Sequence, residues 1–351
     1  MTFLAEDHSW FISERHLRRI LNSLGLFRRR NKSYIIKVAS FISRQLDLSG
    51  RQYGYRLMHL KCMLSGFVIS RENVRVLLGI LDPERVNLRK KRRLVRRRYF
   101  TSGPNQVWHI DSYDKLTPFG IGINGCIDGF ARYIIWMEAS YTNSDPKVIA
   151  GYFVGAILEK HGCPRTVRAD KGTENGSVRQ IQIHLRAEHD DSLAGERSFV
   201  YGKSTANTRI ESLWGILRKQ CVKFWIELFR SLQVDGYFDG YQLDKELIRF
   251  CFMKLIQAEL DGNDTIAYGK PFVMYHQPQL FNPIDRLIPV TVQQVDNTQG
   301  MFRTKDELPC DEDVFILCRH IFQEMRWQYP KDANEARKLY IDLRQIVLLL
   351  I

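Results

Sequence analysis

The sequence predicts a mixed α/β protein with helical segments at both ends. A meander of three apolar, strand-like runs begins near residue 107, and strand-like and helical runs then alternate up to about residue 225. The apolar residues near both ends of the chain recur with the 3.6-residue period of helices. A meander followed by alternating strands and helices gives a sheet that contains both antiparallel and parallel strands.

Residues 1–84 are predicted to form a helical region. Ser13 can cap a helix that Gly25 ends, and Ser70 can cap a later helix with Val74 and Leu78 on one face. Two helix pairs with Gly-containing turns favour helix-turn-helix modules that bind DNA, although a bundle without that role fits the same pattern. The two helices between these caps are predicted to span Lys32–Asp47 and to begin within Tyr53–Leu60.

A basic run forms the predicted linker, residues 85–100. Nine Lys and Arg residues lie between Arg85 and Arg98 with no acid among them, and they account for most of the net charge of +13. So many like charges repel one another unless phosphates or counterions screen them, which indicates a polyanionic partner. The run could instead be solvated surface or a nuclear localisation signal, and the latter does not exclude DNA contact. The candidate DNA-binding residues here are Arg89, Lys90, Lys91, Arg92, Arg93, Arg96, Arg97 and Arg98.

Residues 101–262 are predicted to form the core. Gly129 permits a tight turn between the second and third strands, and Asp128 is expected to shape that turn. The helix over Asp145–His161 is expected to be amphipathic. Strands are predicted at Val107–Ser112, Ile121–Asp128, Tyr133–Ala139, Arg165–Asp170 and Ser198–Tyr201, and further helices at Gln180–Glu188, Asn207–Phe224 and Leu243–Leu260.

Residues 263–351 are predicted to form a C-terminal helical region to which the sequence assigns no chemistry. Four prolines between Pro271 and Pro289 break up its first part, and helices are expected at Val314–Trp327 and Ala333–Leu350. The apolar tail Ile346–Ile351 is much shorter than the roughly 20 residues of a membrane span. We expect this tail either to pack in the protein's own fold or to contact a partner.

The start of the chain and its cysteines indicate an intracellular protein. Met1–Glu14 is polar and acidic, unlike a signal peptide. Seven scattered cysteines form no C-x-x-C pair, which is typical of reduced thiols.

Three carboxylates carry the strongest functional signal. Asp111 and Asp170 lie at or near the ends of strand-like runs, and Glu211 lies on a helical pattern. An acid that ends a buried strand is costly unless its charge is compensated, and a divalent cation is the usual compensator. Three such acids from three elements suggest a site for two Mg²⁺ ions and phosphoryl-transfer chemistry. Each acid taken alone could instead make a local hydrogen bond or be solvated.

The segments around these acids resemble the catalytic core of retroviral integrases and transposases. Asn105–Asp111 looks like the first strand of that core, Ala169–Asn175 like its second acidic motif, and Asn207–Glu211 like the segment with its glutamate. The likeness covers residues 100–225 and is greatest to integrase-core proteins of eukaryotic DNA transposons. It implies a ribonuclease-H-like fold and a DDE-type recombinase that cleaves and joins double-stranded DNA at transposon ends and target.

The resemblance also implies the role of each acid. Asp111 would be shared by two ions, Mg²⁺ or Mn²⁺, while Asp170 would complete one ion and Glu211 the other. Arg218 lies seven residues after Glu211, on nearly the same helix face, where it could hold DNA or simply be a surface charge. Lys171 and Lys219 are candidates for the same role. Asp114 and Glu174 are expected to support the site or to be solvated.

The resemblance has one departure and leaves two alternatives. Retroviral integrases carry a His₂Cys₂ zinc module before the core, whereas the first hundred residues here hold only three histidines and Cys62. A domesticated DNA-binding protein without transposition activity and a ribonuclease-H-like nuclease remain open. Joining two ends to a target needs two active sites, so we expect at least a dimer on DNA, with the C-terminal region as a candidate interface.

Overall fold

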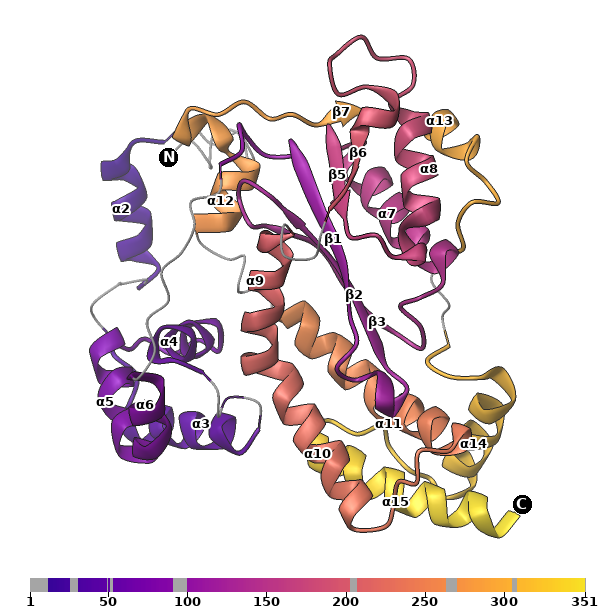
Figure 1. Cartoon of the computed structure of the whole chain (residues 1–351). Coiled ribbons are helices and arrows are strands. Elements are labelled where there is room, and N and C mark those ends of the chain that lie inside the picture. The colour runs from indigo at the N-terminus through magenta and orange to yellow at the C-terminus, as the bar shows by residue number, and fades with distance from the viewer. Residues whose placement is uncertain are drawn as a thin grey trace. The chain divides into compact units, whose positions relative to one another are not determined.

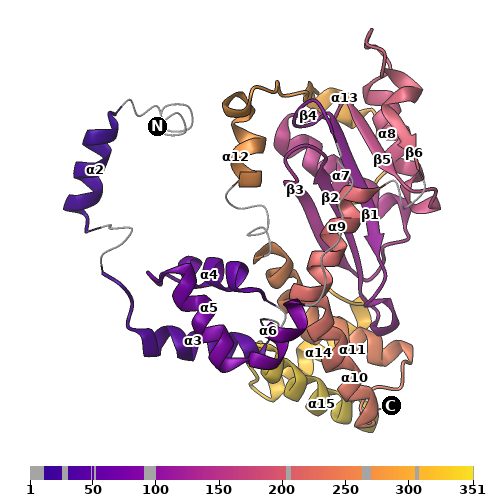
Figure 2. The ribbon, with the colours of Figure 1, turned by 60° about the vertical axis from the view of Figure 1, so that its left-hand side comes forward.

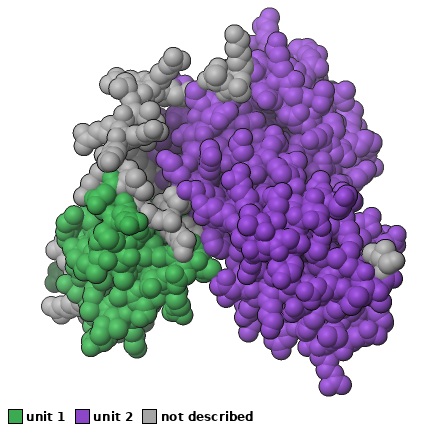
Figure 3. All heavy atoms as spheres, turned by 60° about the horizontal axis from the view of Figure 1, so that its bottom comes forward, with its two compact units in different colours: residues 1–97 green, residues 98–351 purple. Residues whose placement is uncertain are grey.

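The computed structural model divides the chain into two compact units, residues 1–97 and 98–351 (Figure 3). It describes residues 12–25, 31–48, 50, 53–90, 100–202, 207–262, 270–304 and 308–350. Within these ranges no helix is long and apolar enough to cross a membrane.

The first unit is helical, as predicted. Ser13 and Ser70 both cap helices, because their hydroxyl groups accept hydrogen bonds from the backbone of the first turn, His16 N at 3.2 Å and Asn73 N at 3.1 Å. A small core gathers around Val38, and it leaves out the first helix, which buries no residue. The helices are α2 (Glu14–Ser23), α3 (Ile35–Asp47), α4 (Tyr55–Leu64), α5 (Arg71–Leu81) and α6 (Pro83–Lys90).

Helix α6 enters the stretch that the sequence assigns to a linker. Pro83 opens the helix, where its missing N–H is not needed, and Glu84 lies in the first turn, where the helix dipole favours an acid. The backbone of residues 85–90 is therefore helical. The basic run from Lys91 to Arg98 lies outside the described residues.

The second unit is built on a five-stranded mixed sheet in the order β3-β2-β1-β5-β6 (Figure 1). The three meander strands pair antiparallel, and β1 then pairs parallel with β5 and β5 with β6. The predicted mixed α/β fold is thereby confirmed. The strands are β1 (Val107–Tyr113), β2 (Gly122–Asp128), β3 (Ile134–Ser140), β5 (Thr166–Ala169) and β6 (Phe199–Tyr201).

Helices cover both faces of the sheet. Figures 1 and 2 show α7 (Pro146–Lys160) and α8 (Gly176–Leu185) on one side and α9 (Thr208–Leu217) on the other. Because side chains alternate along a strand, Trp108 and Ile110 of β1 enter the α7 side of the core. His109, Asp111 and Tyr113 consequently face α9.

Helix α7 differs from its prediction as an amphipathic helix. Eight of its residues are buried, and apolar residues surround most of its circumference. It is covered by the sheet and by the chain near Arg303, whose carbonyl oxygen would lie 2.0 Å from a Cβ placed on Gly151. A helix enclosed on several sides carries apolar residues all round.

The helix predicted at Asn207–Phe224 is the first half of a longer helical segment. α9 passes into a π-helical turn at Arg218–Val222 and then into α10 (Lys223–Val234). π-Helical turns are rare and occur often at functional sites. α11 (Gln242–Gly262) packs on β3, where the side chain of Gln257 accepts from Ala139 N at 2.8 Å and donates to Met137 O at 3.0 Å.

The C-terminal region shares both cores of the second unit. Tyr275 stacks on Tyr133 with ring centroids 4.4 Å apart, and its hydroxyl donates to Asn105 Oδ1 at 2.7 Å. The last two helices join the core on the α9 side, although Leu348, Leu349 and Leu350 remain exposed. The elements are β4 (Gly162–Cys163), which pairs with β7 (Ile288–Pro289), and α12 (Lys270–His276), α13 (Val292–Asp296), α14 (Glu312–Glu324) and α15 (Ala333–Leu350).

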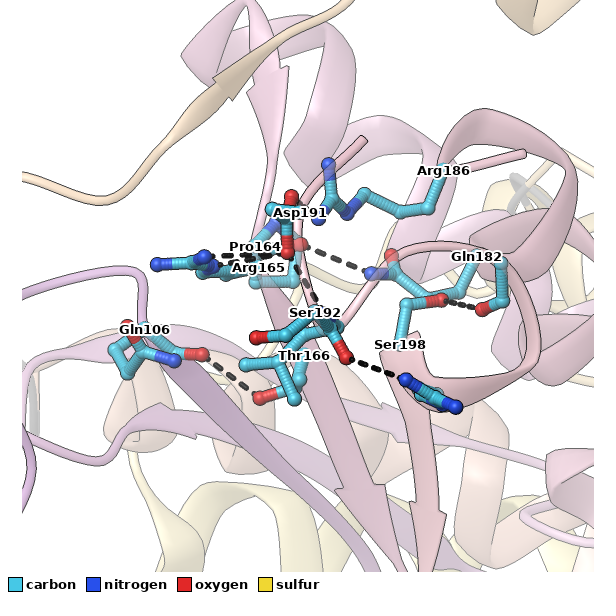
Figure 4. Close-up of polar contacts among 12 residues, drawn as sticks. Gln106, Pro164, Arg165, Thr166, Gln182, Arg186, Asp191, Ser192 and Ser198 are labelled. Carbon is cyan, nitrogen blue, oxygen red and sulfur yellow. Dashed lines mark hydrogen bonds and ion pairs between the residues drawn. The ribbon is translucent and has the colours of Figure 1, made fainter. Parts of the chain in front are cut away.

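A polar cluster closes the amino end of β5 (Figure 4). Asp191, in the loop after α8, accepts hydrogen bonds from Arg165 Nε at 3.2 Å and from Arg186. Arg186 is completely buried, and Gln182 beside it donates to Pro164 O at 2.9 Å. These bonds anchor the connection between β5 and β6.

Candidate active site

The pairing of β1 with β5 places two of the predicted acids side by side. His109 is the register partner of Arg168 on the parallel neighbour, and the register continued by two residues sets Asp111 beside Asp170. Asp170 directly follows the last residue of β5, and its Oδ1 accepts from Gly172 N at 3.2 Å. The turn after the strand thus exposes this carboxylate next to that of Asp111.

Hydrogen bonds join helix α9 and the residue before it to β1 at Asp111 and at the two residues before Asp111. Asn207, at the start of the helix, accepts from His109 Nδ1 at 2.5 Å and donates to Ile110 O at 3.0 Å. Two turns later, Trp214 Nε1 donates to Asp111 Oδ2 at 2.9 Å. Glu211 lies between these fastenings on the same helix face, because positions four and seven residues after Asn207 share a face. The helix therefore holds Glu211 over Asp111.

The carboxylates act on one another electrostatically. The pKa of the Asp111 carboxyl is raised to about 7, mainly by burial and also by the negative charges of Asp170 and Glu211, while the hydrogen bond from Trp214 acts in the opposite direction. No ion pair within the described part of the chain neutralises any of these acids. Among the described residues, the site therefore collects negative charge that no ion pair balances.

This charge fits a hard divalent cation. Within the described residues, no three His, Cys, Asp or Glu side chains are placed to hold one metal ion together. Asp170 and Glu211 each act electrostatically on Asp111. Mg²⁺ keeps several waters and needs only one or two carboxylates, so a pair suffices for each ion of a two-ion site.

Among the cations predicted to bind DNA near the site, Arg218 acts electrostatically on a residue of β1, Tyr113. Burial raises the pKa of Tyr113, and the charge of Arg218 acts in the opposite direction, so the guanidinium lies near the end of β1. Lys219 follows it in the π-helical turn, and Lys171 follows Asp170; all three side chains are exposed.

Sequence reasoning missed His109, Asn207 and Trp214, the side chains that fasten α9. His109 is fully buried, and burial lowers its pKa to about 4. Trp214 also needs Gly125 on β2, because a Cβ there would lie 2.7 Å from its ring. The sequence offered one signal for Asn207 and Trp214. They lie four residues before and three residues after Glu211, a spacing that places side chains on one helix face. Asp128 has the predicted role, since it accepts from the backbone N–H groups of Phe130 and Ala131 in the turn, and its other oxygen accepts from Asn105 N before β1.

Comparison with known proteins agrees with this geometry. The family model described as Integrase core domain matches residues 98–267. The sheet with its flanking helices is accordingly a ribonuclease-H-like integrase core, and such a core implies a DNA-processing protein of the integrase or transposase type. A comparison with curated proteins found no similar chain.

Proposed function

We propose that the chain is a DDE-type recombinase of a eukaryotic DNA transposon that cleaves DNA strands and transfers them. The observation that carries the proposal is the double fastening of α9 to β1, which holds Glu211 over Asp111 while the parallel register sets Asp170 beside it. Three acids from three elements converge, and none of them has an ion-pair partner within the described residues.

In this function Asp111 and Asp170 would hold one Mg²⁺ or Mn²⁺ ion, and Asp111 and Glu211 the other. Bound there, two ions would activate the attacking oxygen and stabilise the leaving oxygen of a phosphodiester. The chain itself orients the carboxylates through Trp214 and Asn207. Arg218, Lys219 and Lys171 would hold the flanking phosphates of duplex DNA.

The decisive test is metal-dependent chemistry on DNA. A labelled duplex with the terminal sequence of the element should be nicked and joined to plasmid DNA in Mg²⁺ or Mn²⁺. Asp111→Asn, Asp170→Asn and Glu211→Gln should each reduce both steps by more than about a hundredfold, because even partners of metal ligands contribute 10- to 100-fold. Unchanged DNA affinity and thermal unfolding would show that only chemistry is lost. Wild-type protein that binds DNA but never cuts it would favour the domesticated alternative, and cleavage confined to RNA–DNA hybrids would favour the nuclease.

The basic run is proposed to contact phosphates and also to direct the protein to the nucleus. Neutralising Arg89–Arg93 and Arg96–Arg98, eight of the nine cations between Arg85 and Arg98, should remove up to eight contacts. Each contact contributes about −0.9 to the slope of log K against log salt on duplex DNA. Affinity and salt slope should fall together. An unchanged slope would leave the run as a targeting signal or solvated surface.

The active form is proposed to be at least a dimer on DNA. Native mass measurement with end DNA should give two or more chains per complex. The exposed leucines at the end of α15 make the C-terminal region a candidate interface. An active complex with one chain would refute the assembly, and an intact assembly after Leu348, Leu349 and Leu350 are changed to Ser would refute this location.

A further inference from the structure

A fourth carboxylate turns back toward Asp170. Glu174 lies in the short 3₁₀ turn η3 (Thr173–Asn175), and its side chain is half-buried. The amide of Asn175 donates to Glu174 Oε1 at 3.0 Å and to Asp170 Oδ1 at 3.3 Å. One nitrogen therefore holds both carboxylates, so the two acids face the same small space.

Gly172 makes this arrangement possible by its lack of a side chain. Its backbone is in an ordinary extended conformation, with φ −72° and ψ 147°, so no unusual dihedral requires glycine. A Cβ at this position would instead lie 2.0 and 2.1 Å from the two carboxylate oxygens of Glu174. The glycine leaves room for the glutamate to reach back toward Asp170.

The charge in this space is not balanced by the protein. Burial raises the pKa of Glu174, and the negative charges of Asp170 and Asp114 raise it further. Asp114 is itself held in place by Asn143 Nδ2 at 2.5 Å. Within the described residues no ion pair reaches Asp170 or Glu174.

The side-chain amide oxygen of Asn175 is buried beside the two acids and has no hydrogen-bond partner among the described residues. The residue is 1 % exposed. A buried, unpaired amide oxygen is costly. Rotation of the amide by half a turn about Cβ–Cγ would exchange the nitrogen for this oxygen, and three oxygens would then face one another, a set suited to a hard cation.

We propose that Glu174, with Asp170 and the amide oxygen of Asn175, forms the cation subsite on the Asp170 side of the active site. The inference rests on the proposed function and adds Glu174 and Asn175 as ligands. With no cation bound, the amide nitrogen donates to both carboxylates. With Mg²⁺ or Mn²⁺ bound, the oxygen replaces the nitrogen.

Two neighbouring glycines provide a matched test. Gly172→Ala should displace the Glu174 carboxylate without unfolding the protein, because the end of a flexible side chain can move aside. Gly176→Ala places its methyl group at the start of α8, where nothing lies within 4 Å. Glu174→Gln removes the charge directly. Binding of Mn²⁺ to each full-length protein, measured by electron paramagnetic resonance and calorimetry without DNA, is the readout.

Glu174→Gln and Gly172→Ala should each weaken the binding of one Mn²⁺ ion at least about tenfold, while Gly176→Ala binds as the wild type does. The side-chain amide resonance of Asn175 should shift with Mg²⁺ in the wild type and not in Glu174→Gln. Equal Mn²⁺ affinity in the wild type and Glu174→Gln would overturn the proposal, and so would equal losses in the two glycine variants.

Failure of this inference differs from failure of the proposed function. If the wild type cleaves DNA and Glu174→Gln binds Mn²⁺ equally well, only the role of Glu174 is refuted. If Mn²⁺ binding depends on Glu174 but the wild type never cleaves DNA, the cation subsite stands and the recombinase is refuted.

Discussion

The two ends of strand β5 hold aspartates in opposite electrostatic surroundings. At the amino end, burial raises the pKa of Asp191, but the hydrogen bonds from Arg186 and Leu193 N and the charge of Arg186 lower it to about 2. At the carboxyl end, Asp170 stands beside Asp111, whose pKa burial and neighbouring acids raise to about 7. The first acid is neutralised inside the protein. The second group of acids has no ion-pair partner among the described residues.

A raised pKa alone does not distinguish such a site. Asp128 is fully buried and also has a pKa raised by burial to about 7. It accepts from the backbone N–H groups of Asn105, Phe130 and Ala131, and these bonds satisfy both of its oxygens. The difference lies in the partners, since Asp111 accepts from the indole of Trp214 and from the backbone of Ser112 but also lies near the charges of Asp170 and Glu211.

The largest effect on stability is expected at the amino end of β5. Asp191→Asn removes the counter-charge of Arg186, which is completely buried, and breaking such a pair typically costs about 3–5 kcal/mol. Urea denaturation should show this loss, whereas Asp190→Asn, at the exposed neighbour, should change stability by less than about 0.5 kcal/mol. Equal stability of the two variants would mean that the arginine cluster does not hold this end of the sheet.

A smaller effect is expected from the donor to Asp111. Trp214→Phe keeps an aromatic ring against Tyr113 but removes the N–H that orients the carboxylate. Loss of such a partner typically lowers metal affinity about 10- to 100-fold. Trp225→Phe is the matched control. Trp225 lies on the same helical segment as Trp214, and its Nε1 donates to Glu259 Oε2 of α11 at 2.7 Å.

The two tryptophan variants separate positioning from folding. Both lose an indole–carboxylate hydrogen bond, so similar destabilisation is expected. Only Trp214→Phe should raise the Mg²⁺ concentration needed for DNA cleavage and for cation binding. Identical Mg²⁺ dependence in both variants would show that Trp214 only packs the helix.

Much of the fold could be predicted because the core follows local rules. All five strands of the sheet lie within about a residue of their predicted bounds, since each is a short apolar run between turn residues. α8 begins at Gly176, four residues before its predicted start, because a glycine there reads as a breaker. The course of residues 270–304 along α7 depends on long-range contacts, such as that of Arg303 with Gly151, which leave no periodic signal.

The site could be predicted in its acids but not in their supports. Asp111 and Asp170 were visible because polar residues at the ends of apolar strands are conspicuous. The hydrogen bond between His109 and Asn207 joins residues 98 positions apart, and it forms only when α9 packs on β1 in this position. For Glu174 the sequence predicts only a supporting or solvated acid, because the direction of its carboxylate depends on the space beside Gly172 in the fold.

The smallest effect is a difference in how the two kinds of aspartate depend on pH. A folded-state pKa of about 7 at Asp111 lies above the unfolded value of about 3.9, so the folded protein binds more protons and loses stability as the pH rises from about 4 to 7. As the pH rises through this window, the free energy of unfolding of Asp111→Asn should therefore increase relative to that of the wild type by about 1 kcal/mol. This is less than the full pKa shift would give, because the carboxylate is partly exposed. Saturating Mg²⁺ favours the charged form and should reverse this gain.

Asp191 has a pKa below its unfolded value, so the stability deficit of Asp191→Asn should instead disappear as the pH falls from about 4 to 2. Urea denaturation at a series of pH values, with and without Mg²⁺, measures both trends. If Mg²⁺ left the Asp111→Asn difference unchanged, Asp111 would be another internally balanced acid like Asp128.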